Sequence, residues 1–138
     1  MKNWTLEGEE PWSQKRVLVT GGNGFLGRAV VAALRSRGAP EILTPRRREC
    51  DLRNGAAIQR LLAETSRSRG GRQTPVDLIV HLAAHVGGIG ANRAHPAEFF
   101  YDNLMMGVQL LHESWRAGVA KFVAITESIV TALTEISV

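Results

Sequence analysis

Three glycines at a fixed spacing lie in the segment TGGNGFLG, residues 20–27. A short, β-branched apolar run, residues 16–20, comes before them, and a helical apolar pattern follows directly. In a strand, turn and helix of this kind, Gly21 permits the tight turn, Gly24 lets the backbone approach a diphosphate, and Gly27 allows the helix to pack closely on the strand. The segment therefore predicts a dinucleotide phosphate site at the start of a helix, with an ordinary turn as the alternative.

Strand-like and helix-like segments alternate along the rest of the chain. The expected strands are residues 16–20, 41–44, the surroundings of 50–52, 76–83 and 119–125. The expected helices run from Phe25 to Gly38, from a cap at Asn54 through Leu62, and from Pro96 to Gly118. The expected loops are residues 66–75 and the stretch with Gly87, Gly88 and Gly90. This alternation predicts an α/β fold, a doubly wound parallel sheet of the Rossmann type that is shortened at its C-terminus.

The longest expected helix carries apolar residues at spacings of three and four. This stripe, which indicates a helix, consists of Phe100, Leu104, Val108, Leu111 and Trp115. Asn103 interrupts it, either to orient a loop near the cofactor or as a buried amide. Met105 and Met106 are expected in the core.

Length and composition limit the organisation of the chain. The 138 residues fit one domain. We expect an N-terminal extension over residues 1–15, with Trp4 and Trp12 exposed, a nucleotide-binding domain over 16–125, and a divergent tail over 126–138. No apolar run is long enough for a signal peptide or a membrane span, and Cys50 is the single cysteine, so a cytoplasmic location is expected.

The net charge of +4 comes largely from local arginine clusters. These clusters lie at residues 46–48 and 67–72 rather than along one helix, so we expect no nucleic-acid partner. His81 and His85 are four residues apart across the end of a strand, a spacing that does not favour a metal site.

The end of the second expected strand predicts the choice of coenzyme. It reads Thr44-Pro45-Arg46-Arg47-Arg48 and contains no acid that would bind the 2′-hydroxyl of NAD. A guanidinium matches a 2′-phosphate, so NADP is favoured, with Arg46 as its partner and Arg47 in reserve. A solvated basic turn is the alternative. Asp51 either accepts from the adenine amino group or is an ordinary turn residue.

Three segments, VLVTGGNGFLG, HLAAHVGGIGANRAHPAEFFYDNLMM and GVAKFVAI, resemble the extended short-chain dehydrogenases, the NAD-dependent epimerase/dehydratase family, and within it the GDP-L-fucose synthases. The resemblance implies that the chain is the NADP(H)-binding portion of an epimerase-reductase for GDP-4-keto-6-deoxymannose. The cofactor-binding residues that it implies are Gly21, Gly22, Asn23, Gly24, Phe25, Leu26, Gly27, Arg46, Asp51, Leu52, Leu82, Ala83, Ala84 and His85. The substrate loop that it implies is Val86, Gly87, Gly88 and Ile89.

The chain departs from this family after the last expected strand. It reads Thr126-Glu127-Ser128 where the family has a Gly-Ser or Gly-Thr turn, and Tyr101, its only tyrosine, has Met105 in the place of the catalytic lysine. We therefore expect no catalytic residue, no substrate domain and no turnover by this chain alone, because the reduction needs a phenol beside an ammonium group.

Three other hypotheses stay open. The first is a non-catalytic nucleotide-binding or dimerisation module that forms a homo-oligomer, or pairs with a full-length subunit, through the helix of residues 96–117. The second is a fragment of another NAD(P)-dependent sugar-nucleotide epimerase or dehydratase. The third is a gene product without function, in which the last strand would leave an open sheet edge.

Overall fold

A four-stranded parallel sheet forms the centre of the molecule. The computed structural model describes residues 11–125, so Trp4, the first ten residues and the tail 126–138 lie outside the described part. The strands are β1 (Arg16–Thr20), β2 (Glu41–Leu43), β5 (Leu78–His81) and β6 (Lys121–Ala124), in the order β2-β1-β5-β6. Every neighbouring pair is parallel, with Leu18 opposite Leu43 on one side and Ile79 on the other.

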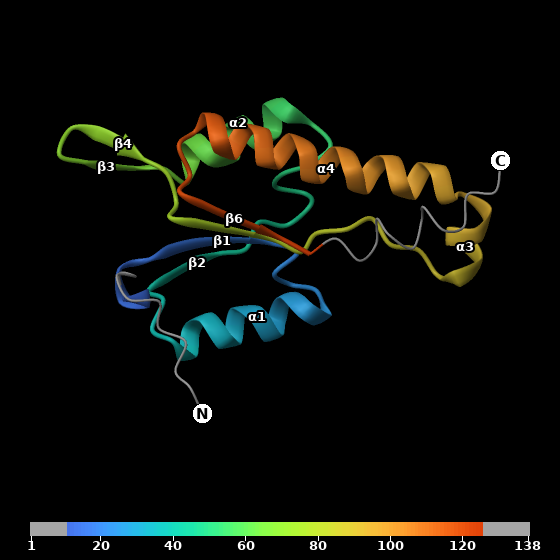
Figure 1. Ribbon diagram of the computed structural model, residues 1–138, viewed down its shortest axis with the longest axis horizontal. Helices are drawn as coiled ribbons and strands as arrows, with labels where there is room; N and C mark the ends of the chain where they lie inside the picture. The colour runs from blue at the N-terminus through green and yellow to red at the C-terminus, as the bar shows by residue number, and fades with distance from the viewer. Residues whose placement is uncertain (1–10, 126–138) are drawn as a thin grey trace.

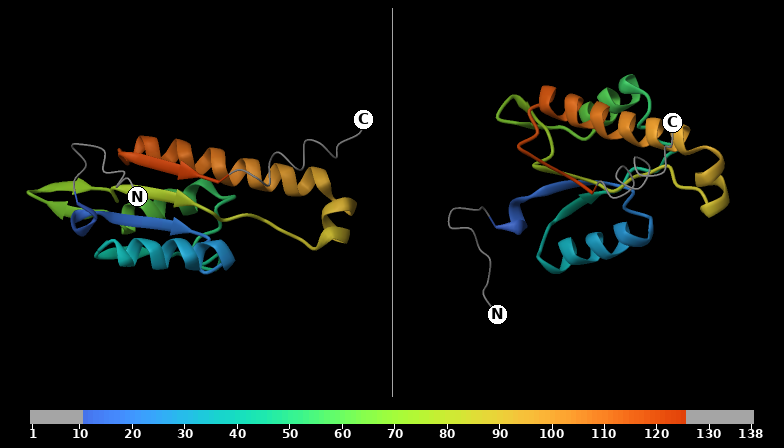
Figure 2. Two further views of the ribbon diagram at one scale, coloured as in Figure 1. Left: turned by 60° about the horizontal axis from the view of Figure 1, so that its bottom comes forward. Right: turned by 45° about the vertical axis from the view of Figure 1, so that its right-hand side comes forward.

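Helices cover both faces of this sheet, as Figures 1 and 2 show. The helices are α1 (Phe25–Ser36), α2 (Gly55–Glu64), α3 (Ile89–Ala94) and α4 (Pro96–Arg116), with a short 3-10 turn, η1 (Trp12–Gln14), before β1. In Figure 1, α1 lies below the sheet, whereas α2 and α4 pack side by side above it. The predicted doubly wound α/β class is confirmed.

The two faces of the sheet bury separate apolar cores. On one face Leu18 and Ile79 pack with Ile58 of α2 and Leu110 of α4, and all four are 0% exposed. On the other face Val17, Val19 and Val80 pack with Val31 and Leu34 of α1. Because β1 and β5 are covered on both sides, they are short apolar runs without polar alternation. Trp12, expected to be exposed, is partly buried against this second core.

Local sequence signals fix the ends of the helices. The Asn54 side chain accepts hydrogen bonds from the backbone amides of Ala56 and Ala57, as the predicted cap of α2 should. Pro96 occupies the first turn of α4, where its missing amide costs nothing. Gly38 and Gly118 follow α1 and α4 with φ values of +87° and +79°, a region that favours glycine.

Three expectations about local structure were wrong. Residues 50–52 form no strand, because the turn at Arg46, closed by hydrogen bonds from the amides of Glu49 and Cys50 to its carbonyl, carries the chain away from the edge of β2. The expected loop 66–75 contains an antiparallel hairpin, β3 (Arg67–Arg69) and β4 (Arg72–Thr74). Its tip is Gly70-Gly71, both at positive φ, a pair that suits a two-residue hairpin turn. The expected glycine loop includes the short helix α3.

The apolar stripe of α4 that the sequence shows is not the face that the helix buries most deeply. The residues of α4 that are buried are Asn103, Met106, Leu110 and Ser114. Val108, Leu111 and Trp115, from the predicted stripe, are 52%, 50% and 74% exposed. The periodicity of a helix does not by itself say which of its faces packs on the sheet. Among the described residues, no helix is long and apolar enough to cross a membrane.

Candidate functional site

The glycine turn after β1 brings three backbone segments into contact. Gly21 has φ +71°, and a Cβ there would lie 2.7 Å from the amide nitrogen of Ala83, which follows β5. A Cβ on Gly22 would lie 2.6 Å from the Thr44 side chain after β2. A Cβ on Gly27 would overlap the Gly21 carbonyl oxygen. The glycines therefore let the turn, the helix and the neighbouring strand ends pack together.

The first turn of α1 opens at this point with unpaired donors. Gly24 is the residue before the helix, and no side chain caps it. Phe25, Leu26 and Gly27 begin the helix, so their amide groups have no partner within it. These amides and the helix dipole make a local site for an anion. Phe25 is 98% exposed, which leaves its ring at the mouth of the site.

A cavity of about 460 Å³ lies at the carboxyl end of β1. It is bounded by the glycine turn, the turn after β2, the segment before α2 and the segment after β5. Its lining contains Thr20, Gly21, Asn23, Gly24, Phe25, Leu26, Gly27, Pro45, Arg46, Arg47, Cys50, Asp51, Leu52, Arg53, Leu82, Ala83, Ala84, His85, Val86 and Met106. The structure thus brings most of the predicted site residues around one cavity.

Some predicted site residues lie outside this cavity. Gly22 is buried against Thr44 behind the turn, so its part is in packing. Gly87 and Gly88 follow the cavity wall, and Ile89, which begins α3, is 77% exposed. The predicted substrate loop therefore leads away from the cavity after Val86.

The basic turn after β2 contributes two guanidinium groups. Arg46 and Arg47 line the cavity, whereas Arg48 does not, and all three are exposed. The backbone amide of Arg46 donates to the Glu49 carboxylate at 2.8 Å, which helps to close the turn. Asn23 reaches across from the glycine turn and donates to the carbonyl of Thr44 at 3.5 Å.

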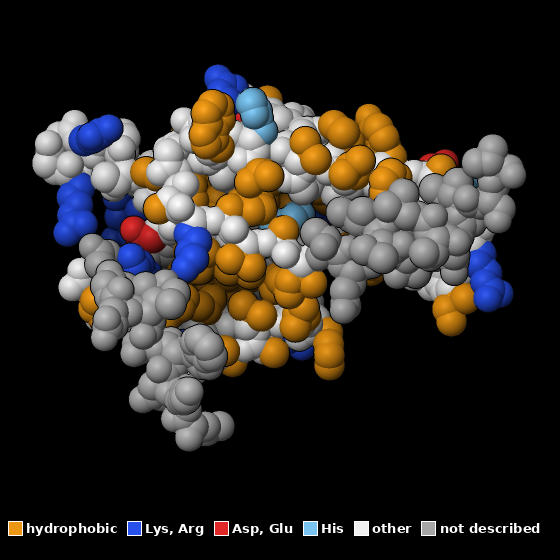
Figure 3. All heavy atoms as spheres, viewed as in Figure 1, with side chains coloured by type: hydrophobic (Ala, Val, Ile, Leu, Met, Phe, Trp, Pro, Cys, Tyr) orange, Lys and Arg blue, Asp and Glu red, His pale blue; other side chains and the backbone are white. Residues whose placement is uncertain are grey.

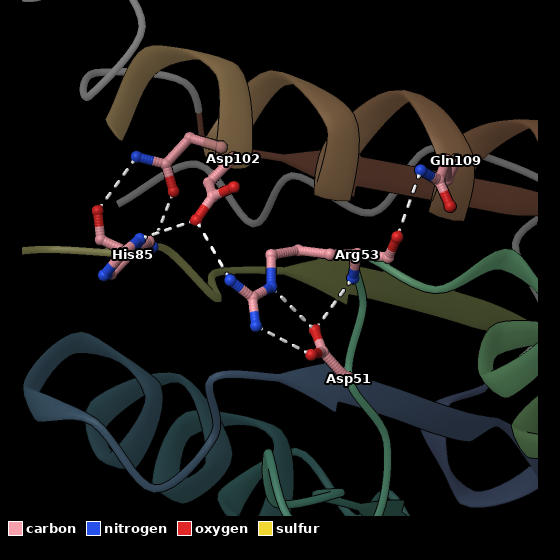
Figure 4. Close-up of polar contacts among 6 residues, drawn as sticks. Asp51, Arg53, His85, Asp102 and Gln109 are labelled. Carbon is pink, nitrogen blue, oxygen red and sulfur yellow. Dashed lines mark hydrogen bonds and ion pairs between the residues drawn. The ribbon is translucent and has the colours of Figure 1, made fainter. Parts of the chain in front are cut away.

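An ion-pair network connects the segment before α2 with α4 and with the segment after β5, as Figure 4 shows. Arg53 donates to both oxygens of Asp51, at 3.1 and 2.8 Å, and to Oδ2 of Asp102 at 3.2 Å. The same Asp102 oxygen lies 2.8 Å from Nδ1 of His85, so the ring donates at that nitrogen. Hydrogen bonds from the Arg53 side chain hold the pKa of Asp51 down, at about 2.

The backbone of His85 is fixed separately by Asn103. The Asn103 side chain accepts from the His85 amide at 2.6 Å and donates to the His85 carbonyl at 3.0 Å. The Phe99 ring lies 4.6 Å from the imidazole, between ring centroids. Asn103 is thus a buried amide, and its two hydrogen bonds also orient the loop that begins at His85. The sequence offered these two roles as alternatives, and one side chain has both.

The two histidines that the sequence places four apart have different partners. His81 is buried at the end of β5, and its Nδ1 lies 2.7 Å from Thr20 Oγ1. Burial lowers the pKa of His81. Among residues 11–125, no three histidine, cysteine or acidic side chains are grouped as metal ligands would be. Burial also raises the pKa of Cys50, a free cysteine in the cavity lining.

Sequence reasoning missed the parts of the site that depend on packing between distant segments. Arg53, Asp102, Pro45 and Met106 were not predicted, although Arg53 follows the predicted Asp51 by two residues. A carboxylate on α4 that faces an arginine 49 positions earlier has no sequence signal of its own.

The fold and the site together define a class of protein. A parallel sheet runs into a glycine turn, the turn begins a helix, and a cavity lies at the carboxyl end of the central strand. This is the arrangement of a dinucleotide-binding Rossmann domain. The chain belongs to the NAD dependent epimerase/dehydratase family, whose family model matches residues 17–132.

Known relatives agree with this assignment. The chain is 36% identical to the GDP-L-fucose synthase of Azorhizobium caulinodans over 114 residues, which is 83% of this chain and 33% of the relative. It superimposes on the GDP-mannoheptose C4 reductase of Campylobacter jejuni with NADP bound, with a TM-score of 0.69, 28% identity and coverage of 85% and 33%. A Naegleria fowleri GDP-L-fucose synthetase bound to NADP gives a TM-score of 0.64, 26% identity and coverage of 81% and 31%. The chain spans about a third of the length of these relatives.

Proposed function

We propose that this chain binds NADP(H) as the cofactor-binding part of a GDP-L-fucose synthase-like epimerase-reductase. The observation that carries the proposal is the cavity onto which the glycine turn and two arginines, Arg46 and Arg47, both open. The first amides of α1 would hold the cofactor's diphosphate, and the arginines would hold the 2′-phosphate of its adenosine. When bound, the cofactor would supply hydride for the reduction of a keto sugar in the intact enzyme.

Charge in the cavity supports NADP over NAD. Asp51 is the one acid among the described lining residues, and its carboxylate is paired with Arg53 on both oxygens. Arg46 and Arg47 make no ion pair within the described part of the chain. A 2′-phosphate would therefore meet two unpaired guanidinium groups and no unpaired acid.

Titration calorimetry with NADPH and NADH tests this proposal. We expect NADPH to bind more tightly than NADH, and Arg46→Ala to weaken NADPH about tenfold while leaving NADH unchanged. Arg48→Ala is the matched control, because Arg48 lies on the same turn outside the cavity lining. A well-folded wild-type chain that binds neither coenzyme would overturn the proposal.

The wider reaction is part of the same proposal. The relatives named above suggest a GDP-sugar substrate, GDP-4-keto-6-deoxymannose in the GDP-L-fucose synthases, and another sugar-nucleotide epimerase or dehydratase is the alternative. We propose that the chain alone does not turn over this substrate. Tyr101 is its only tyrosine, it is 63% exposed on α4, and no lysine follows it at the fourth place. NADPH consumption by the purified 138-residue chain with the keto-sugar nucleotide would contradict this.

A second candidate function is a dimerisation module, which the outer face of α4 favours. Hydrophobic side chains lie over α4 on the face shown in Figure 3. On the same helix, Val108, Leu111 and Trp115 are half or more exposed on successive turns, and a helix pair would bury such apolar side chains. We expect the purified chain to self-associate through this stripe, and Trp115→Ser to reduce the association. A wild-type chain that sediments as a monomer at all concentrations would exclude self-pairing.

A further inference from the structure

Arg53 lines the cavity, yet its side chain is paired with two acidic residues. Its guanidinium donates to both oxygens of Asp51 and to Asp102, so at least three of its five N–H donors are used. Its backbone carbonyl also accepts a hydrogen bond from Gln109 of α4 at 3.4 Å. The side chain is 38% exposed and lines the cavity, so it is held in place without being covered.

The charge of Arg53 is already balanced by its partners. Two carboxylates, one from the segment before α2 and one from α4, face a single guanidinium (Figure 4). A phosphate brought to this group would also meet both acids, so Arg53 is a poor anion site. Arg46 and Arg47, by contrast, form no ion pair among the described residues, although the charge of Arg47 is one of the causes that lower the pKa of Asp51. The two kinds of arginine in the cavity therefore suit different parts of a ligand.

Hydrogen bonding of this kind leaves the flat face of the guanidinium uncovered by its two carboxylate partners. Because N–H donors point outward in the plane of the group, the two carboxylates occupy the edges and leave the flat face. A flat cationic face held in one orientation is a stacking surface for an aromatic ring. Leu52, buried beside Arg53, also lines the cavity and adds an apolar contact.

We propose that Arg53 is the stacking platform for the purine base of the cofactor, held in orientation by Asp51 and Asp102. This inference rests on the proposed binding of NADP(H). It assigns the adenine ring to the flat face of Arg53 and the 2′-phosphate to the turn at Arg46. Asp102, which is not part of the cavity lining, is then a positioning residue that acts through Arg53.

Calorimetry with three ligands tests the platform: NADPH, 2′,5′-ADP and reduced nicotinamide mononucleotide. Arg53→Lys keeps the positive charge but removes the flat face. We expect it to weaken NADPH and 2′,5′-ADP by the same factor, about fivefold to tenfold, and to leave the mononucleotide unchanged. Arg48→Lys, on the neighbouring turn and outside the cavity lining, is expected to change none of the three affinities.

Other outcomes separate the stacking role from a structural or purely electrostatic one. Asp102→Asn is expected to weaken 2′,5′-ADP less than Arg53→Lys does, and to add little to it in the double variant, since both act through one contact. If the Arg53→Lys variant binds 2′,5′-ADP as tightly as the wild type does, the platform is wrong while NADP(H) binding stands. If the variant weakens the mononucleotide equally, the effect is general loosening and the platform is again wrong. A wild-type chain that binds none of the ligands overturns both proposals.

Discussion

Asp102 accepts a hydrogen bond from the imidazole of His85 at 2.8 Å, although the two residues lie in different elements, 17 positions apart. Asp102→Ala removes this acceptor and leaves His85 Nδ1 without a carboxylate. We expect the variant to be less stable by about 1 kcal/mol in urea unfolding, because the pair is partly exposed. Glu98→Ala, on the same helix with a carboxylate 78% exposed, is the matched control and should change stability by less than about 0.5 kcal/mol. Equal effects of the two changes would contradict the prediction.

Gly27 lies against the carbonyl oxygen of Gly21, where a methyl group would overlap the backbone. We expect Gly27→Ala to destabilise the fold by about 3 kcal/mol or more, since the helix would have to move from the turn. Circular dichroism during chemical denaturation measures the change. Gly90→Ala is the control, because a Cβ on Gly90 meets nothing within 4 Å and alanine favours the helix around it. A Gly27→Ala variant as stable as the wild type would show that the turn is not fixed by this contact.

Two adjacent leucines on α4 have opposite environments. Leu110 is 0% exposed, whereas Leu111 is 50% exposed. Leu110→Ala is expected to cost about 2 to 5 kcal/mol of unfolding free energy through the cavity that it leaves. Leu111→Ala is expected to cost less than about 1 kcal/mol but to weaken self-association, if that face pairs as proposed. Urea unfolding at a concentration where the chain is monomeric, together with sedimentation equilibrium, separates the two effects. The reverse ranking would mean that α4 packs on the sheet through its other face.

Burial of His81 makes stability depend on pH. Because burial lowers the pKa of His81 below its ordinary 6.5, the unfolded chain takes up a proton at a higher pH than the folded one. The contribution is fully present above pH 6.5 and decreases as the pH falls toward the lowered folded value. We expect the unfolding free energy to fall between pH 7.5 and pH 5.5, and this part of the fall to be missing in His81→Gln. Asp51 does not contribute there, since its pKa drops from 3.8 to about 2 and its effect is confined to stronger acid. An identical slope in both chains would contradict the assignment.

The elements that the sequence predicts well are those with a local physical cause. The glycine spacing, the cap at Asn54, the proline that begins α4 and the apolar runs of β1 and β5 act within a few residues of each other. These features are enough to predict the doubly wound sheet and the position of the turn. They also place most of the candidate residues around one cavity, because parallel strands end at the same edge of the sheet.

The failures concern choices that local sequence leaves open. Residues 50–52 contain apolar side chains around one acid, which is compatible with the end of a strand. No sequence feature shows that the turn at Arg46 directs them away from β2. Apolar residues lie on more than one face of α4, and only packing on Leu18 and Ile79 selects the face with Leu110. Arg53 and Asp102 meet only once α2 and α4 lie side by side.

The hairpin of β3 and β4 precedes β5, so it extends from the end of the sheet opposite the cavity, as Figures 1 and 2 show. Side chains added at its Gly70-Gly71 tip would meet nothing within 4 Å. Such a tip is a suitable place for a peptide tag or a fluorescent label. A reporter attached there would follow the chain in solution or on a surface while leaving the cavity at the other end of the sheet unobstructed.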